Sequence, residues 1–415
     1  MNKQNIYELE PSGLSKSLDG PSFRATQVLN WVYKKNILDF KEMSNLPKDY
    51  REQLSDKFTV GSLGLLRKEV SSDGSEKYLF ALKDGKTVET VLLKMKDDEF
   101  DEEGKKTREA RYTLCISSQV GCKVGCAFCL TAKGGFDRNL TAGEIVEQVA
   151  FIKKEKEFGE EKSINIVYMG MGEPLDNLEN VAKSIKIITH KDTLCIAPRR
   201  ITISTSGLAA KIEKLANMEL GVNLAISLHA VDDELREALM PINKAYNIKS
   251  VIDAVRKFKA DKRKKVLFEY LLLGDVNDDI KSAQKLGKLL NGLEVKINLI
   301  LFNPYENSQF KRPTIAAAEA FRKYLADKRF ICTIRESKGI DISAEDGLEQ
   351  RGIVVHGQTS MGAGYFGSGK AKLVIENKNT AEDTLKIRTT GKFEHYPLIE
   401  AKAEVNGTAK IDIKG

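Results

Sequence analysis

Three cysteines in a short stretch are the residues of this sequence whose types and spacing most directly suggest chemistry. Cys122, Cys126 and Cys129 follow a C-x3-C-x2-C spacing around Gly125, after a run typical of a strand. Thiolates on such a tight loop can bind three irons of a [4Fe–4S] cluster and leave the fourth iron open for an exogenous ligand. The spacing therefore predicts an iron–sulfur centre.

Two other interpretations of these cysteines stand beside this one. A structural zinc site needs four closed ligands, and none of the four histidines lies near the loop in the sequence. Burial in an apolar core is the second alternative, but a loop that contains glycine is poor core material. The chain has six cysteines, four of them within fifteen residues, and this clustering favours metal binding or catalysis over a disulfide framework.

Four further polar motifs each follow a strand-like run. They are Gly170–Pro174 (Gly-Met-Gly-Glu-Pro), Ser204–Gly207 (Ser-Thr-Ser-Gly), Ser227–His229 (Ser-Leu-His) and Asn303–Pro304. Backbone amides beside glycines, together with one carboxylate, can hold an amino group and its neighbouring carboxylate. Each motif alone is compatible with an ordinary strand end, but their joint placement predicts a site for an organic ligand next to the open iron.

The fold class expected from the pattern is α/β. Six apolar runs predict strands, at residues 112–117, 164–169, 200–204, 222–227, 266–272 and 296–301. Helices are expected between them, for example Thr141–Lys154, which starts with a capping box, and Ile248–Lys259. This alternation predicts a parallel sheet, and six units fit an open, partial (β/α)6 barrel. The polar motifs then lie at the carboxyl ends of the strands, where such barrels carry their chemistry.

Four segments are expected along the chain. Residues 1–63 predict a helical accessory domain, and residues 64–98 a small β-hairpin segment whose strand-like runs flank Lys83–Lys86. Residues 108–342 predict the barrel, after a charged stretch interpreted as a solvated loop. Residues 343–415 predict a divergent, β-rich C-terminal tail of unknown fold, with strand-like alternation in Lys370–Ile375 and Ala403–Ile413.

Composition narrows the class of protein. The chain has 415 residues, of which 41% are apolar, and 66 Lys and Arg oppose 59 Asp and Glu for a net charge of +7. No apolar run approaches the roughly 20 residues that span a bilayer. The polar start lacks the apolar core of a signal peptide. We therefore expect a cytoplasmic protein without a membrane partner, whose charge permits a polyanion partner without requiring one.

Beyond these patterns, the string Leu114–Cys129 resembles the radical S-adenosylmethionine (radical SAM) signature as it occurs in the RNA adenosine-C2 methyltransferase family of RlmN/Cfr type. The same resemblance is carried by the strings Gly134–Leu140, Met171–Pro174, Ser204–Gly207, Ser227–Ala230, Met240–Asn243 and Lys296–Ile300. Phe23–Ala25 and Asn45–Pro47 resemble the accessory domain of that family. The resemblance runs from about Tyr7 to about Ile342.

The resemblance implies a specific reaction. Members of the family methylate C2 of an adenine in 23S rRNA and, in many bacteria, in tRNA. One S-adenosylmethionine methylates a cysteine, and a second is cleaved at the cluster to a 5′-deoxyadenosyl radical, which takes a hydrogen from that S-methyl group. The carbon radical adds to C2, a base removes the C2 proton, and a second cysteine releases the product by forming a disulfide. A [4Fe–4S] cluster, S-adenosylmethionine, an electron donor such as flavodoxin or ferredoxin, and a monomeric enzyme are implied.

The resemblance also assigns roles to residues. Cys122, Cys126 and Cys129 would bind the cluster. The residues that would contact S-adenosylmethionine are Gly172, Glu173, Ser204, Ser227, Leu228, His229 and Asn303. Glu89 matches the proton acceptor and Cys115 the cysteine that releases the product. Without the resemblance, Glu89 would be taken for an exposed strand carboxylate and Cys115 for a small buried strand residue.

One position departs from the family. The methyl-carrying cysteine lies in a segment Gly-x-Asp-Ile-x-Ala-Ala-Cys-Gly, whereas residues 339–347 read Gly-Ile-Asp-Ile-Ser-Ala-Glu-Asp-Gly, with Asp346 in place of the cysteine. A carboxylate cannot replace a thiolate here, because a thioether stabilises the adjacent carbon radical. Three explanations remain open: an altered tail, a paralogue with different radical chemistry, or another methyl carrier, Cys332 or Cys195. An RNA-binding protein without catalysis is the rival from a different class.

Overall fold

The computed structural model of the chain describes residues 3–18, 21–159, 162–258, 265–305, 308–335, 338, 339 and 342, and three short strands beyond them. Asp346 lies outside the described residues, as does most of the predicted tail. The three later strands, Val374–Glu376 (β17), Thr384–Arg388 (β18) and Lys410–Asp412 (β19), form a sheet in the order β17-β18-β19.

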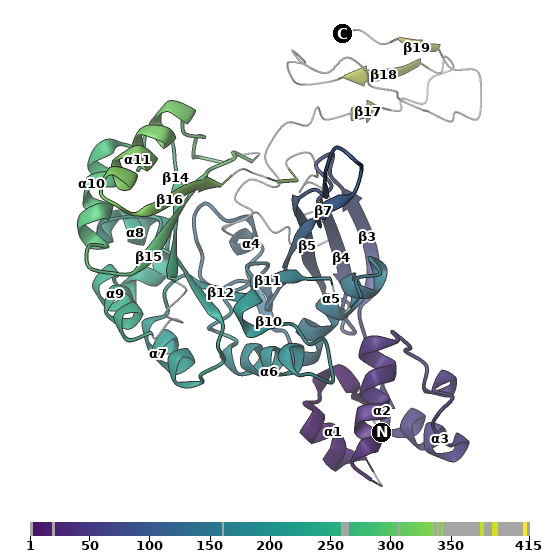
Figure 1. The fold of residues 1–415 in the computed structure, drawn as a ribbon. Helices are drawn as coiled ribbons and strands as arrows, with labels where there is room; N and C mark the ends of the chain where they lie inside the picture. Colours follow the sequence, from purple (N-terminus) through teal and green to yellow (C-terminus); the bar gives the residue numbers. More distant parts are fainter. Residues whose placement is uncertain are drawn as a thin grey trace.

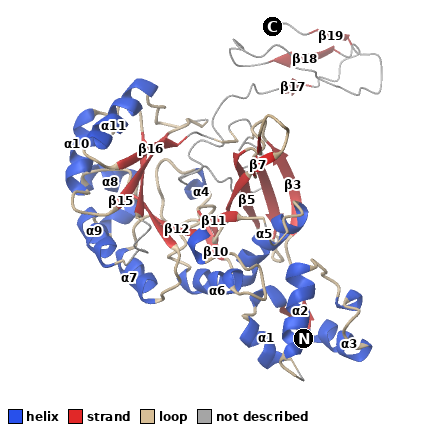
Figure 2. Cartoon of the chain, viewed as in Figure 1, coloured by secondary structure: helices blue, strands red, loops and turns tan. Residues whose placement is uncertain are grey.

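A curved ten-stranded sheet forms the centre of the molecule, in the order β16-β15-β14-β13-β12-β11-β8-β5-β4-β3 (Figures 1 and 2). Its parallel strands are β8 (Arg111–Cys115), β11 (Ile164–Tyr168), β12 (Ile201–Thr205), β13 (Asn223–Ser227), β14 (Val266–Leu272), β15 (Val295–Leu301) and β16 (Ile331–Arg335). The six predicted strands are confirmed, and β16 adds a further parallel strand at the edge. The two edges do not pair, so the barrel is open, as expected.

Helices cover the outer face of this sheet (Figure 2). They are α5 (Ala142–Glu155), α6 (Leu178–Thr189), α7 (Ala209–Asn217), α8 (Asp233–Leu239), α9 (Ile248–Lys257), α10 (Ile280–Leu289) and α11 (Ile315–Asp327). The predicted capping box starts α5, because Thr141 accepts from the Glu144 amide and Glu144 from the Thr141 amide. Ile145, Val149 and Ile152 of its apolar face are fully buried. Apolar periodicity thus places the helices on the sheet.

The predicted hairpin is part of the main sheet. Strands β3 (Gly64–Val70), β4 (Glu76–Ala81) and β5 (Thr87–Lys96) run antiparallel, and β5 pairs with β8 so that Val91 lies opposite Cys115. The charged stretch before β8 was expected to be a loop, and this is wrong in part. It contains a two-stranded ribbon of β6 (Glu99–Phe100) and β7 (Lys106–Arg108).

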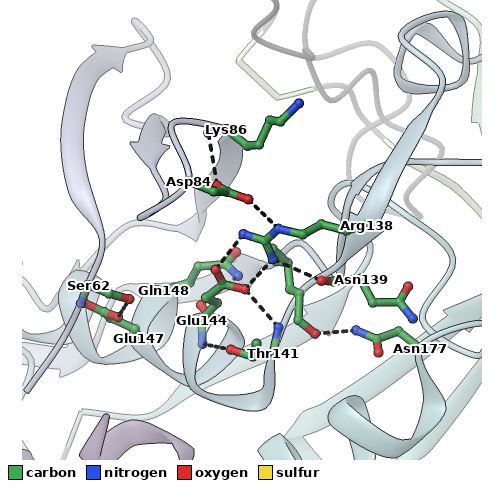
Figure 3. Close-up of polar contacts among 11 residues, drawn as sticks. Ser62, Asp84, Lys86, Arg138, Asn139, Thr141, Glu144, Glu147, Gln148 and Asn177 are labelled. Carbon is green, nitrogen blue, oxygen red and sulfur yellow. Dashed lines mark hydrogen bonds and ion pairs between the residues drawn. The ribbon is translucent and has the colours of Figure 1, made fainter. Parts of the chain in front are cut away.

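A salt-bridged arginine ties the hairpin turn to the barrel (Figure 3). Arg138 lies on β10 (Phe136–Asn139), and its guanidinium donates two hydrogen bonds to Glu144, at 2.8 and 2.9 Å. Its Nε donates to Asp84 in the β4–β5 turn at 2.7 Å. A bidentate pair of this kind fixes orientation as well as distance. The start of α5 therefore holds β5, which carries Glu89, against the sheet.

The N-terminal segment is helical and lies below α5 and α6 in Figure 1. It contains α1 (Pro11–Ser17), α2 (Phe23–Leu29) and α3 (Lys48–Lys57), short turns η1 (Ile6–Glu8), η2 (Asn30–Lys34) and η3 (Phe40–Glu42), and a pair of two-residue strands, β1 (Gln4–Asn5) and β2 (Phe58–Thr59). The Glu147 carboxylate of α5 accepts from the backbone amides of Ser62 and Leu63, at 2.5 and 2.8 Å. These bonds join the segment to the barrel. Of the helices in the described residues, none is long and apolar enough to cross a membrane.

Candidate functional site

The cysteine loop lies between β9 (Gln119–Gly121) and the short helix α4 (Leu130–Lys133). Pairing of β9 with β10 closes the loop at its base, and the Cys122 amide donates to the Gly135 carbonyl at 2.8 Å. Gly121 has φ +75°, and a Cβ there would lie 2.0 Å from the Gly135 carbonyl oxygen. Only glycine fits this close approach, so backbone contacts hold the base of the loop.

The three thiols lie in surroundings that disfavour their free thiolates. Cys126 and Cys129 are buried and Cys122 is half-buried. Burial raises the pKa of Cys122 and of Cys129, and the negative charge of Cys129 raises that of Cys122 further. Irons bound to the sulfurs would supply the positive charge that makes the thiolates stable. This donor set therefore fits an iron–sulfur cluster.

The side chains of the loop are not arranged around a single metal ion. Within the part of the chain that the structure describes, no group of three or more His, Cys, Asp or Glu side chains could hold a single metal ion. A [4Fe–4S] cluster does not need such convergence, because each cysteine binds a different iron.

A cavity opens beside the cysteine loop. Five predicted site residues line it, namely Cys122, Gly172, Glu173, Ser204 and Ser227. Sequence reasoning did not assign its other lining residues, Val124, Tyr168, Met169, Gly170, Pro174, Thr205 and Ser206. Several of these belong to the motifs already singled out. The structure thus brings together the strand-end motifs of β11, β12 and β13 with the first cysteine.

Glu173 is the acidic group of this cavity and is 4% exposed. Its carboxylate accepts from the Ser206 amide at 2.7 Å, from the Ser206 hydroxyl at 2.8 Å and from the Leu175 amide at 3.0 Å. Burial raises the pKa of Glu173, while the bonds from Ser206 act in the opposite direction. A ligand ammonium group would stabilise the ionised carboxylate further.

The glycines of the neighbouring motif are required by packing. A Cβ on Gly170 would lie 2.7 Å from the backbone of Ile116, and one on Gly172, which has φ +97°, would lie 2.5 Å from the Gln119 side chain. Gln119 in turn accepts from the Glu173 amide at 2.8 Å. The glycines therefore let the loops after β8 and β11 touch, and this contact sets the position of Glu173.

His229 presents a buried donor that has no partner in the structure. Its Nδ1 accepts from the Leu271 amide at 3.1 Å, so the hydrogen of the neutral ring lies on Nε2. Burial, helped by the charge of Arg236, lowers the pKa of His229 to about 3, which keeps the ring neutral. Nε2 is buried without a hydrogen bond, and the ring packs edge-on against Phe128 of the cysteine loop at 5.1 Å. An orphaned donor next to the loop fits a ligand bound there.

The remaining predicted contacts do not line the cavity. Leu228 is fully buried, and its amide donates to the Glu269 carbonyl at 3.0 Å. Asn303 follows β15 and is 6% exposed. Glu269 is a functional candidate that sequence reasoning missed. Its carboxylate is fully buried and accepts from the hydroxyls of Ser204 at 3.2 Å and Ser227 at 3.5 Å, which orients both serines. The sequence feature that could have identified Glu269 is the presence of one acidic residue within the apolar strand β14.

Glu89 and Cys115 lie on neighbouring strands beside the same loops. Glu89 is 3% exposed, so the interpretation as an exposed strand carboxylate is wrong. Its carbonyl accepts from the Ser117 hydroxyl at 2.5 Å, and that hydroxyl accepts from the Met171 amide at 2.9 Å. Cys115 is buried, and burial, with the charge of Glu269, raises its pKa.

A buried lysine accompanies Glu89. The Nζ of Lys77 lies 3.8 Å from Glu89 Oε1 and 2.6 Å from Glu69 Oε2, and Lys77 is 5% exposed. We expect Lys77→Met to lower the free energy of unfolding by about 3 kcal/mol, because it leaves the buried Glu89 carboxylate without this cation. The double variant Lys77→Met, Glu89→Gln should recover most of the loss. Urea unfolding of the unmodified chain, the two single variants and the double variant measures the coupling free energy between Lys77 and Glu89. If the effects of the two substitutions simply add, the expectation is contradicted.

Neither described alternative methyl carrier faces the cavity. The charges of Arg322 and Glu319 on α11 act on Cys332, whereas the adjacent Thr333 bonds to Asn298, which lies beside Glu269 on the inner face. Alternation along β16 therefore turns Cys332 toward the helices, and burial raises its pKa to about 12.

Cys195 lies far from the strand ends that carry the site. It is exposed, in the connection between α6 and β12, and therefore at the amino end of the strands. Parallel strands carry the cavity at their opposite, carboxyl ends. Neither Cys332 nor Cys195 therefore lines the cavity of the described residues.

Comparison with known proteins agrees with this geometry. Residues 116–286 match the family model described as the radical SAM superfamily, and residues 4–60 match that of a ribosomal RNA large subunit methyltransferase N-terminal domain. The chain is 61% identical to the dual-specificity RNA methyltransferase RlmN of Nitratiruptor sp. over 344 residues. This alignment covers 83% of this chain and 97% of that protein. It is 59% identical over 349 residues to the RlmN of Campylobacter concisus, covering 84% and 91%.

The chain is also similar to a solved structure of a radical SAM methyltransferase. The crystal structure of a radical SAM methyltransferase from Sphaerobacter thermophilus superposes with a TM-score of 0.74 at 38% identity, covering 82% of this chain and 97% of that one. Radical SAM enzymes use a [4Fe–4S] cluster and S-adenosylmethionine, and the donor set of the cysteine loop and the orphaned His229 donor fit both. The chain belongs to the RlmN family of radical SAM RNA methyltransferases.

Proposed function

We propose that this chain is a radical SAM enzyme of the adenine-C2 type that binds 23S rRNA and tRNA and cleaves S-adenosylmethionine reductively, but lacks the residue that carries the methyl group to C2. The observation that supports the cleavage is the cavity in which Cys122, Glu173, Ser204 and Ser227 meet. The curated relatives are dual-specificity RNA methyltransferases, which supports the choice of RNA substrates.

Cys122, Cys126 and Cys129 would hold the cluster, which supplies the electron that splits the carbon–sulfur bond of bound S-adenosylmethionine. The residues of this chain orient the ligand. Glu173 would bind the ammonium group of its methionine part, because a buried carboxylate next to the cysteine loop attracts a cation. Ser204 and Ser227, whose hydroxyls donate to Glu269, would accept hydrogen bonds from the nucleoside part. We assign Leu228, His229 and Asn303 to the same ligand.

Glu89 would take the C2 proton, and Lys77 would keep it ionised until then. The Lys77 ammonium group, 3.8 Å from the buried Glu89 carboxylate, favours the charged form of that carboxylate. Cys115, opposite Val91 on β5, would release the product. Both roles require a methylated carrier, so in this chain they would go unused.

The absent carrier follows from the sequence at Asp346 and from the positions of Cys332 and Cys195. Cys332 faces the helices and Cys195 lies at the opposite end of the strands, so neither reaches the cavity. We propose a monomer that receives single electrons from a donor such as flavodoxin or ferredoxin. The four segments 1–63, 64–98, 108–342 and 343–415 are proposed as its units.

RNA binding tests the substrate class separately from catalysis. Filter binding of the full chain to a 23S rRNA fragment, to tRNA and to an unrelated hairpin is compared at two salt concentrations. We expect the first two to bind more tightly than the hairpin at both concentrations, with affinity that falls as salt rises. Equal affinity for all three RNAs would contradict the proposed substrates.

A further inference from the structure

Among the described residues, Arg236 of α8 has the largest side chain that is fully buried. Its guanidinium donates to neutral oxygens only: the carbonyls of Ser206 (2.6 Å), Tyr246 (3.1 Å), Leu228 (3.2 Å) and Ser227 (3.4 Å) and the side-chain amide of Asn243 (2.8 Å). The charge of Asp233 acts on Arg236 without a direct ion pair between these two described residues, because the Asp233 carboxylate accepts from the Asn243 side-chain amide at 3.0 Å. A buried cation that lacks a direct carboxylate partner is costly, and a second negative charge nearby would stabilise it further.

These bonds tie together the strand ends that form the cavity. Ser206 follows β12, Ser227 ends β13 and Leu228 follows β13, so one planar fork fixes both strands at their carboxyl ends. Gly207 makes room for the fork, because a Cβ there would lie 3.1 Å from Arg236 Nη2. Gly207 also has φ +100°, which other residues rarely adopt.

The segment that carries Arg236 packs against the cysteine loop. The Ala127 amide donates to the carbonyl of Leu239, the last residue of α8, at 2.9 Å. A Cβ on Gly125 would lie 3.9 Å from Pro241 of the following turn η5 (Pro241–Lys244). Burial lowers the pKa of Arg236 to about 10, and a Cys126 thiolate acts in the opposite direction. Arg236 is therefore charged at neutral pH and close enough to Cys126 to interact with it.

We propose that Arg236 is a positioning residue whose buried charge raises the reduction potential of the cluster bound by the three cysteines. Three thiolates make the bound cluster anionic, and reduction adds one electron from the external one-electron donor. A fixed positive charge in a medium of low dielectric constant stabilises the more negative, reduced state. The inference rests on the cluster-binding part of the proposed function and is independent of the RNA substrate.

Three substitutions separate charge from geometry. Arg236→Lys keeps the charge and loses the fork, whereas Arg236→Gln and Arg236→Met lose the charge. Each full-length chain is reconstituted anaerobically, and the reduced fraction is followed by electron paramagnetic resonance during a redox titration. At the wild-type midpoint we expect the ratio of reduced to oxidised cluster to fall at least tenfold in the Gln and Met variants, which equals about 59 mV for one electron. Arg236→Lys should stay within threefold.

Asn243→Ala is the matched structural control. It removes a partner of the fork and keeps the charge, so its ratio should also stay within threefold. A wild-type ratio in Arg236→Gln or Arg236→Met overturns the inference, and so does an equal fall in Arg236→Lys or Asn243→Ala. If the Gln variant does not fold, the Met variant decides, because apolar groups of similar volume often replace buried charges without loss of stability. If the wild-type chain binds no cluster, the proposed function fails instead.

Discussion

We expect Cys126→Ala to abolish formation of 5′-deoxyadenosine and to leave a chain that retains no intact cluster. Cys126 is one of three thiols on the loop between β9 and α4, and it is buried, so no solvent ligand easily takes its place. Loss of groups that merely orient metal ligands lowers metal affinity 10- to 100-fold. Loss of a ligand itself should therefore lower the rate of S-adenosylmethionine cleavage more than about 100-fold. Iron and sulfide per chain, and 5′-deoxyadenosine by mass spectrometry, measure both effects.

Cys332→Ala is the control for this substitution. It removes an equally buried cysteine, but one that faces α11. Iron content and cleavage rate should therefore equal those of the unmodified chain. A Cys126→Ala chain that still bound a full cluster and cleaved S-adenosylmethionine would remove the loop from the proposed site.

We expect the double substitution Glu345→Ala, Asp346→Cys to produce 2-methyladenosine in 23S rRNA, and the unmodified chain to produce none. It restores the Ala-Ala-Cys-Gly string of the family at residues 344–347, and with it a thiolate that can accept a methyl group from S-adenosylmethionine. The carbon radical formed on such a thioether is stabilised by sulfur, which a carboxylate ester does not do. Nucleoside digestion and mass spectrometry measure the product against zero background.

Glu345→Ala alone, which keeps Asp346, is the matched control and should yield no 2-methyladenosine. Adding Cys115→Ala to the double variant should block release and leave the RNA attached to the chain. A double variant that makes 5′-deoxyadenosine at the normal rate and no 2-methyladenosine would show that residue 346 is not where the methyl carrier is missing.

Local patterns predicted most of the fold and part of the site. The capping box at Thr141 and Glu144 depends on neighbours three residues apart, and the cysteine loop on eight consecutive residues, so both were visible in the sequence. The strand-end motifs were found because parallel strands end at one rim. The ribbon of β6 and β7 was missed because its residues are charged and exposed, with no apolar alternation.

The buried charges could not be predicted for a different reason. Arg236 lies among charged residues of a short helix and Lys77 at the start of a strand, and both would be expected at the surface. Their burial follows from long-range packing, by which Arg236 reaches Ser206 and Lys77 reaches Glu89. Periodicity within one element carries no information about such partners.

The most direct test combines both products of the unmodified chain in one anaerobic reaction. The reconstituted protein is mixed with a strong reductant, S-adenosylmethionine and a 23S rRNA fragment, and the digest is analysed for 5′-deoxyadenosine and 2-methyladenosine. The account predicts 5′-deoxyadenosine without 2-methyladenosine. Formation of 2-methyladenosine would contradict the missing carrier, and absence of 5′-deoxyadenosine from a chain with a full cluster would contradict the proposed cleavage site.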